Sequence, residues 1–118
     1  MQQAVCGLIG PVCTSQARTK WNALFKEQGL LAFFDFYRTK TREDLELRLS
    51  EMYLLERRGY VVAEEFQTSI LPLLDRLDPV AEEKECVNTV VNDRGVLVGY
   101  FCGDDQRRME LWFRSGSS

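Results

Sequence analysis

The stretch that decides the fold is VNTVVNDRGVLVGY, residues 87–100. Two short runs of mainly β-branched and aliphatic residues, which are typical of buried strands, lie at 87–91 and at 96–101, one residue beyond this stretch. The segment NDRG, residues 92–95, separates the two runs, and a polar segment that ends in glycine is a common signal of a tight turn. The sequence therefore predicts a β-hairpin near the end of the chain.

Helices and strands alternate in the sequence before this hairpin. Thr41 with Asp44 three residues later is typical of a helix N-terminus, and Gly29 is a natural helix stop. Pro72 lies inside one predicted helix, where we expect it in the first turn or at a bend. Expected strands span residues 4–9, 31–37 and 60–63, and expected helices span 15–28, 41–58 and 66–77, with a further helical turn at 81–85. This order predicts an α/β fold, a mostly parallel sheet flanked by helices with a C-terminal β-hairpin.

The composition is that of one globular domain. The chain has 118 residues, of which 45% are hydrophobic and 28% charged, and its net charge is −3. No apolar run approaches the roughly 18 residues of a membrane helix. The first residues lack the basic start of a signal peptide, and the basic residues are scattered among acids. We therefore expect neither a membrane nor a nucleic acid as partner.

Histidine is absent, which removes the most common general base and metal ligand from any candidate site. The four cysteines, Cys6, Cys13, Cys86 and Cys102, form no CxxC pair, so the usual zinc patterns are not met. A chain of this size can bury a core without disulfides. We expect no metal site, reduced thiols and a cytoplasmic location.

Two segments resemble one enzyme family. LPLLDRLDPVAEEKECVNTVVNDRGVLVGY, residues 71–100, resembles the substrate-binding domain of shikimate dehydrogenases, where V-N-T-V-V-N-x-x-G-x-L-x-G-Y follows a leucine-rich helix and a D-P-x-A turn. GLIGPVCTSQARTKWNALFKEQGL, residues 7–30, is similar to the opening segment of that family, with one residue missing after Gly10. The resemblance implies such a domain over residues 4–114, and we expect residues 115–118 to be a disordered tail.

The resemblance also implies a cofactor that this chain would not hold by itself. Shikimate dehydrogenases interconvert 3-dehydroshikimate and shikimate in aromatic amino acid biosynthesis, and a second, Rossmann-type domain binds their NADP. That domain would begin just after Tyr100, whereas this sequence ends at Ser118 and has no GxGxxG loop after a strand. We therefore expect a degenerate, stand-alone substrate-binding domain without a cofactor, which is not an enzyme on its own.

Three residues match substrate contacts of the family. Ser15 corresponds to the first of two serines that hold the substrate carboxylate. Asn88, with Thr89 beside it, corresponds to an asparagine that binds the ring hydroxyls. Two of these residues have a second interpretation, because Ser15 could cap the first helix and Asn88 could close backbone hydrogen bonds at a strand end.

The catalytic positions of the family are changed in this chain. The catalytic lysine corresponds to Gln67 and the catalytic aspartate to Gly103. Glutamine can donate a hydrogen bond but cannot transfer a proton, and glycine has no side chain. Asp104 would reach the aspartate position only through a one-residue backbone shift. Further polar contacts of the family are replaced by Ala17, Val61 and Ala63. We expect no catalysis and weak or no binding of shikimate.

Several functions remain open beside simple loss of activity. The domain could bind a small hydroxylated acid or another anion, for which Arg18 is a new cation near the old carboxylate site. It could be an interaction protein that forms a homo-oligomer through its apolar residues 109–113. That segment, an edge strand or a helix, could instead fold back on its own sheet. A separate chain could also supply the nucleotide-binding domain.

Overall fold

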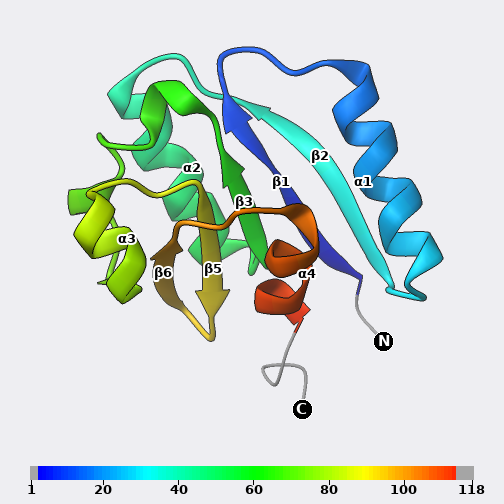
Figure 1. Ribbon diagram of the computed structural model, residues 1–118. Helices are drawn as coiled ribbons and strands as arrows, with labels where there is room; N and C mark the ends of the chain where they lie inside the picture. The colour runs from blue at the N-terminus through cyan, green and yellow to red at the C-terminus, as the bar shows by residue number, and fades with distance from the viewer. Residues whose placement is uncertain (1–2, 114–118) are drawn as a thin grey trace.

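The computed structural model describes residues 3–113, which form a six-stranded sheet flanked by helices (Figure 1). The strands are β1 (Ala4–Gly10), β2 (Ala32–Arg38), β3 (Gly59–Val62), β4 (Arg76–Leu77), β5 (Thr89–Asp93) and β6 (Val96–Tyr100). The helices are α1 (Ser15–Glu27), α2 (Arg42–Leu54), α3 (Pro79–Lys84) and α4 (Asp105–Phe113). The tail expected at residues 115–118 lies outside the described residues.

The strand order is β2-β1-β3-β5-β6-β4, and only β5 runs against the other strands of this sheet. β1 pairs in parallel with β2 and β3, and β4 pairs in parallel with β6. The mostly parallel sheet predicted from the sequence is therefore confirmed. The hairpin between β5 and β6 is also confirmed, because Arg94 and Gly95 take φ values of 54° and 93°, as a two-residue hairpin turn requires.

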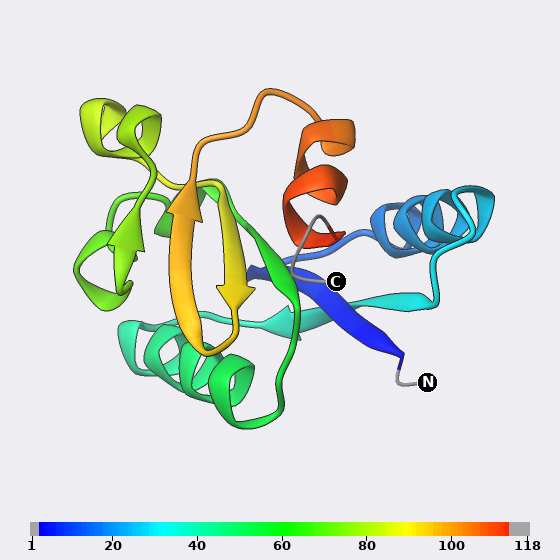
Figure 2. The same ribbon diagram turned by 90° about the horizontal axis from the view of Figure 1, so that it is seen from below.

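The sheet separates two apolar cores, with α1 and α4 over one face and α2 over the other (Figure 2). The buried residues on the α1 and α4 side are Cys6, Trp21, Phe25, Phe34, Val91, Cys102, Met109, Leu111 and Trp112. Those on the α2 side include Ile9, Leu45, Leu49, Met52, Tyr60, Val62 and Val90. Apolar cover on both faces is what a mainly parallel sheet requires.

Helix α2 begins as predicted and ends early. Thr41 and Asp44 form a capping box, in which each side chain accepts a hydrogen bond from the backbone N–H of the other residue. The helix ends at Leu54, not near residue 58, because Glu56 takes a left-handed φ of 54° that stops an α-helix. No helix within residues 3–113 has the length and apolar character needed to cross a lipid bilayer.

Residues 66–77 do not form the helix that their apolar spacing predicts. The segment around them contains two 3₁₀ turns, η1 (Glu64–Phe66) and η2 (Leu71–Leu73), and then β4. Pro72 has no N–H with which to continue a helix. Asp75 instead bonds to β6, where its N–H donates to the Leu97 carbonyl over 2.9 Å and its carboxylate accepts from the Leu97 N–H over 2.8 Å. Pairing with β6 therefore overrides the helical spacing of the leucines.

Residues 109–113 form the second half of helix α4, so the helix is the correct alternative for this segment. Met109 and Leu111 are each 4% exposed and Trp112 is 1% exposed, because α4 folds back on the sheet of its own chain. The Trp112 indole N–H donates to the Val90 carbonyl over 3.1 Å. These three side chains are therefore not available to a partner, and the fold-back alternative describes the segment. The oligomeric state itself stays a prediction.

Candidate functional site

The residues singled out from the sequence follow or precede strands that meet at one edge of the sheet. Because β1, β3 and β6 are parallel, their carboxyl ends lie at the same edge, and antiparallel β5 begins there (Figure 1). Ser15 follows β1, Gln67 follows β3, Asn88 precedes β5, and Gly103 follows β6. The topology thus brings all four positions to one edge of the sheet.

Asn88 is 8% exposed, and its side-chain amide is bonded at both ends. Its Nδ2 donates to the carbonyl of Cys102 over 2.9 Å, and its Oδ1 accepts the N–H of Cys102 over 2.8 Å. The Thr89 hydroxyl donates to the same Oδ1 over 3.0 Å. Of the two interpretations from the sequence, the structure therefore has the one in which Asn88 closes backbone hydrogen bonds.

Thr89 is completely buried and belongs to a polar network that joins three elements. Its hydroxyl accepts a hydrogen bond from Nε of Arg108 on α4 over 2.8 Å. Arg108 also pairs with Asp105 over 2.6 Å, and Lys20 on α1 pairs with the other oxygen of Asp105 over 2.7 Å. Burial raises the pKa of Asp105, but the bonds from Lys20 and Arg108 outweigh it and lower that pKa below its ordinary value. The network holds α4 against β5 and α1.

Gln67, which the resemblance aligns with the family's catalytic lysine, bonds to the end of β3 and to the residues that precede β5. Its Nε2 donates to the Val62 carbonyl over 3.0 Å, and its Oε1 accepts from the Cys86 thiol over 3.3 Å. Its backbone carbonyl accepts the N–H of Val87 over 2.9 Å. Both ends of the amide are thus engaged in joining the end of β3 to the approach to β5, and the side chain has no group that could carry a proton.

Gly103, which the resemblance aligns with the family's catalytic aspartate, has no side chain. The residue is exposed, and a Cβ added there would meet nothing within 4 Å. Asp104 does not take over this position, because its Oδ1 accepts the backbone N–H of Arg107 over 2.8 Å at the start of α4.

Ser15 is exposed at the first position of α1, and it is not the cap of that helix. The capping side chain is Thr14, whose hydroxyl accepts the N–H of Ala17 over 3.2 Å. Arg18, the new cation of this helix, pairs with Asp35 of β2 over 3.0 Å. Its charge is therefore balanced within the chain, which weakens the case for an anion site at this position.

The buried cysteines supply no reactive group at the site. Burial raises the pKa of the Cys6 thiol and of the Cys102 thiol, so both stay protonated at neutral pH. Within residues 3–113, no cluster of three or more cysteine, aspartate and glutamate side chains could hold a metal ion. Neither of these two buried cysteines therefore supplies a thiolate.

Two clefts in the described part of the chain lie away from these residues. One, of about 710 Å³, opens at the opposite end of the sheet beside Arg57, Arg58 and the hairpin turn. The other, of about 670 Å³, lies between α2 and β6 and includes Leu49, Tyr53 and Leu97. None of Ser15, Gln67, Asn88, Thr89 and Gly103 lines either cleft.

The role of Arg108 is the feature that sequence reasoning missed. The spacing of Asp105 and Arg108 is the i,i+3 spacing of a helical ion pair, which could have been read from the sequence. Its contact with Thr89, nineteen positions away, could not. Among the predicted site residues, the structure joins Asn88 and Thr89 directly.

Curated proteins similar to this chain are named as shikimate dehydrogenases or as like them. Shikimate dehydrogenase (NADP(+)) of Bacillus licheniformis is 37% identical over 97 residues, which cover 81% of this chain and 34% of that enzyme. A shikimate dehydrogenase-like protein of Haemophilus influenzae is 38% identical over 64 residues, which cover 54% of this chain and 24% of that protein. No family model matches the chain.

A solved structure shows the same fold. The crystal structure of shikimate 5-dehydrogenase from Listeria monocytogenes, in complex with shikimate and NAD, matches with a TM-score of 0.76 and 33% identity. The match covers 83% of this chain and 34% of that one. This chain therefore spans about a third of the length of the enzymes it matches.

Proposed function

Because this chain is a homologue of shikimate dehydrogenases and matches their N-terminal domain, we propose that it keeps the substrate-binding fold without the reaction. In this proposal the chain neither oxidises shikimate nor binds it with the affinity of an enzyme. No cofactor site is assigned to it, since the sequence has no glycine-rich phosphate loop after a strand. The inherited residues at the carboxyl edge of the sheet now stabilise the fold.

The proposal rests on the hydrogen bonds that the Asn88 side-chain amide makes within the chain. A ligand hydroxyl could donate to Oδ1 of that amide only by displacing the Cys102 N–H or the Thr89 hydroxyl, because these two donors occupy both lone pairs of the oxygen. Each donor left unpaired in a buried position would cost about 1–3 kcal/mol. Since 1.4 kcal/mol is about a tenfold change in affinity, such losses bring a micromolar ligand toward the millimolar range.

The occupants of the catalytic positions support the proposal independently. Gln67 uses both ends of its amide within the chain, and it has no titratable group. Gly103 contributes no side chain to orient a neighbour. A positioned acid–base group typically contributes about 10²–10⁴-fold to a rate, and both such groups are missing here.

The test combines an activity assay with a binding assay on the purified chain. Shikimate is added with NADP or NAD, and reduction of the nicotinamide is followed by absorbance, with a full-length shikimate dehydrogenase as positive control. We expect no reduction, and no calorimetric signal for shikimate below millimolar concentration. Turnover that disappears in the Ser15→Ala variant would overturn the proposal, and so would a micromolar dissociation constant.

A second function is favoured by the outer surface of α2. Leu47, Leu54 and Leu55 are 51%, 72% and 61% exposed, and neighbouring exposed leucines often mark a site of protein association. Leu47 and Leu54 lie the same number of residues before and after the peptide bond that joins Ser50 to Glu51. A two-fold axis at that point would place Leu47 of one copy near Leu54 of the other. We therefore assign homo-oligomer formation to this face, in place of residues 109–113.

Light scattering tests this second function. We expect a dimeric mass for the wild type and a monomeric mass for a Leu47→Glu/Leu54→Glu variant. Val12→Glu is the matched control, because Val12 is 74% exposed but lies outside α2. A monomeric wild type, or an equal effect of the control, would contradict this assignment.

A cytoplasmic location is part of the proposal and is supported by the four cysteines, all of which are free.

A further inference from the structure

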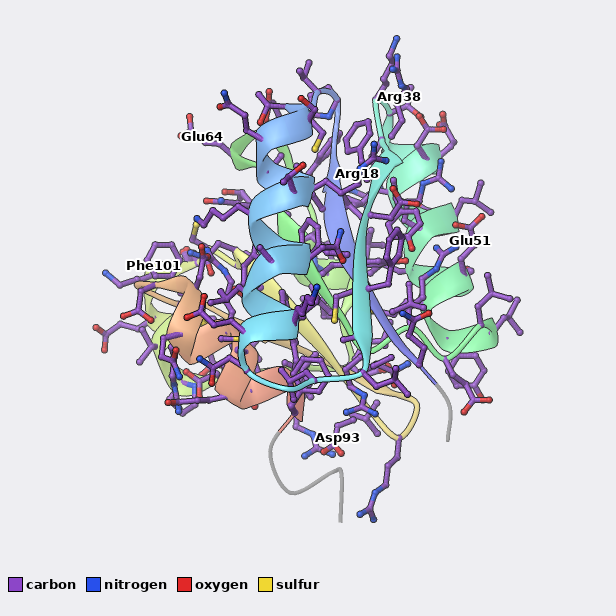
Figure 3. All side chains as sticks on the ribbon, turned by 90° about the vertical axis from the view of Figure 1, so that its right-hand side faces the viewer. Arg18, Arg38, Glu51, Glu64, Asp93 and Phe101 are labelled. Atoms are coloured by element: carbon purple, nitrogen blue, oxygen red, sulfur yellow. The ribbon has the colours of Figure 1, made fainter. Side chains whose placement is uncertain are left out.

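Strand β2 is an edge strand of the sheet, and its sequence AFFDFYR is strongly β-prone. An edge strand presents unpaired N–H and carbonyl groups to which a second chain can add a strand. Figure 3 looks onto this edge, with α1 on one side of β2 and α2 on the other. Phe33 is 40% exposed and Leu31, just before the strand, is 51% exposed, so the edge also carries apolar surface.

The outward groups of β2 can be identified from its pairing with β1. The Leu31 carbonyl accepts from Ala4, and the Thr39 N–H donates to Gly10, so the odd-numbered residues direct their backbone groups toward β1. The backbone groups of the even-numbered residues, which include Phe34 and Phe36, therefore face away from the sheet. These are the groups that an added strand would need.

Asn22 of α1 bonds Phe34 as a neighbouring strand would. Its Oδ1 accepts the Phe34 N–H over 2.8 Å, and its Nδ2 donates to the Phe34 carbonyl over 2.9 Å. The same Nδ2 also donates to the carbonyl of Arg18 within α1, which fixes the amide in this orientation. Both outward groups at the centre of the strand are thus already occupied.

Two further side chains occupy outward groups along the same edge. Asp35 accepts the N–H of Phe36 over 2.8 Å, and the same oxygen is paired with Arg18. Arg48 of α2 donates two hydrogen bonds to the Arg38 carbonyl, over 3.1 and 2.9 Å. Figure 3 shows Arg18 beside β2 and Arg38 at its end.

We infer that Asn22, Asp35 and Arg48 form an edge guard, which prevents a second copy of this chain from adding its own β2 to the sheet. The occupant excluded is a second copy, because two antiparallel β2 strands centred on Asp35 would bring apolar residues of the same sequence together. In that pairing Asp35 would face Asp35 of the other copy, and like charges directly opposite are destabilising. The guard thus combines occupied backbone groups with charge repulsion, and it leaves the α2 face free.

The test removes the guard at two positions. In Asn22→Ala/Asp35→Ala we expect light scattering to show a mass that rises with concentration above that of the wild type. Hydrogen exchange should show new protection confined to residues 31–39. Asn92→Ala is the matched control, because Asn92 also bonds backbone carbonyls, at Met52 and Arg57, but lies away from β2. We expect the control to keep the wild-type mass.

Three results would overturn the inference. The first is a folded double variant with the wild-type mass, and the second is equal association in Asn92→Ala. The third can be measured in the wild type, where rapid hydrogen exchange of the Phe34 and Phe36 amides would show that the edge guard is not formed. This third measurement needs no variant, so it decides even where the double variant does not fold. Added Phe33→Lys in the double variant should reverse the association, since a charge on an edge strand opposes pairing.

Discussion

Arg108 of α4 donates a hydrogen bond from Nε to the hydroxyl of Thr89 on β5 over 2.8 Å. The Thr89 hydroxyl in turn donates a hydrogen bond to Oδ1 of Asn88. The Asn88 amide bonds both the N–H and the carbonyl of Cys102, which follows β6. Residues that the family resemblance assigns to substrate binding are thus part of the contact between a helix and the sheet. The following predictions test what this contact does.

Arg108→Ala should destabilise the fold. The Arg108 side chain is 14% exposed and bonds both Asp105 and Thr89. Loss of hydrogen bonds that involve a charged group should lower the free energy of unfolding by about 1.5–3 kcal/mol. Arg107→Ala is the control, because Arg107 pairs with Glu110 at 3.6 Å and both side chains are 53% exposed. Its effect should stay within about 0.5 kcal/mol. Urea unfolding followed by circular dichroism measures both, and equal effects would contradict the role of the network.

The contribution of Asp105 should depend on pH. Its pKa is lowered in the folded chain, because bonds from Lys20 and Arg108 outweigh the effect of burial. A folded pKa below the unfolded one means that the stabilisation is complete above the unfolded pKa, about 4, and is lost as the pH falls through the folded value. The difference in unfolding free energy between wild type and Asp105→Asn should therefore shrink below about pH 4. Urea titrations at several pH values measure it.

A constant difference at every pH would contradict the charged form of Asp105 as the stabilising species. Glu51 does not disturb the comparison, although hydrogen bonds from Arg48 and Arg57 outweigh burial and lower its pKa as well. Its carboxylate is present in both proteins, so its titration cancels in the difference between them.

Trp112→Ala should unfold much of the protein. The indole is 1% exposed, lies 5.1 Å from the Trp21 ring, and donates to the Val90 carbonyl. Gly59 leaves no room for a Cβ beneath it. Removing so large a buried side chain costs about 3–5 kcal/mol. Trp112→Phe keeps most of the packing but loses the hydrogen bond, which should cost about 1–3 kcal/mol. Thermal unfolding by circular dichroism ranks them, and a fully stable alanine variant would contradict the packing of α4.

Much of the fold could be predicted because local signals agree with tertiary structure. The Thr41 and Asp44 capping box and the turn before Val96 depend on residues a few positions apart, so the sequence contains them completely. The segment around Pro72 could not be predicted in this way. Its leucines have helical spacing, but the partner that decides its structure is Leu97, more than twenty positions later.

The candidate site could likewise be predicted from the sequence only in part. The sequence places Ser15, Gln67, Asn88 and Gly103 at one edge once the parallel order is known. It leaves open what Asn88 bonds, because an amide can serve a ligand or a backbone equally well. The answer depends on the path of the chain after β6 and on the packing of α4, both of which are set by long-range contacts.

Lysine and aspartate at the two positions that the resemblance assigns to catalysis should not produce activity. The substitutions Gln67→Lys and Gly103→Asp are compatible with the fold, since an ammonium group can still donate to the Val62 carbonyl and a Cβ at position 103 meets nothing within 4 Å. Neither change releases Asn88 from Cys102 or Thr89 from Arg108. We therefore expect the double variant to keep its circular dichroism spectrum, to give no calorimetric signal with shikimate, and to reduce no NADP. Micromolar binding by the double variant would contradict this expectation and would show that the buried Asn88 amide opens to ligands.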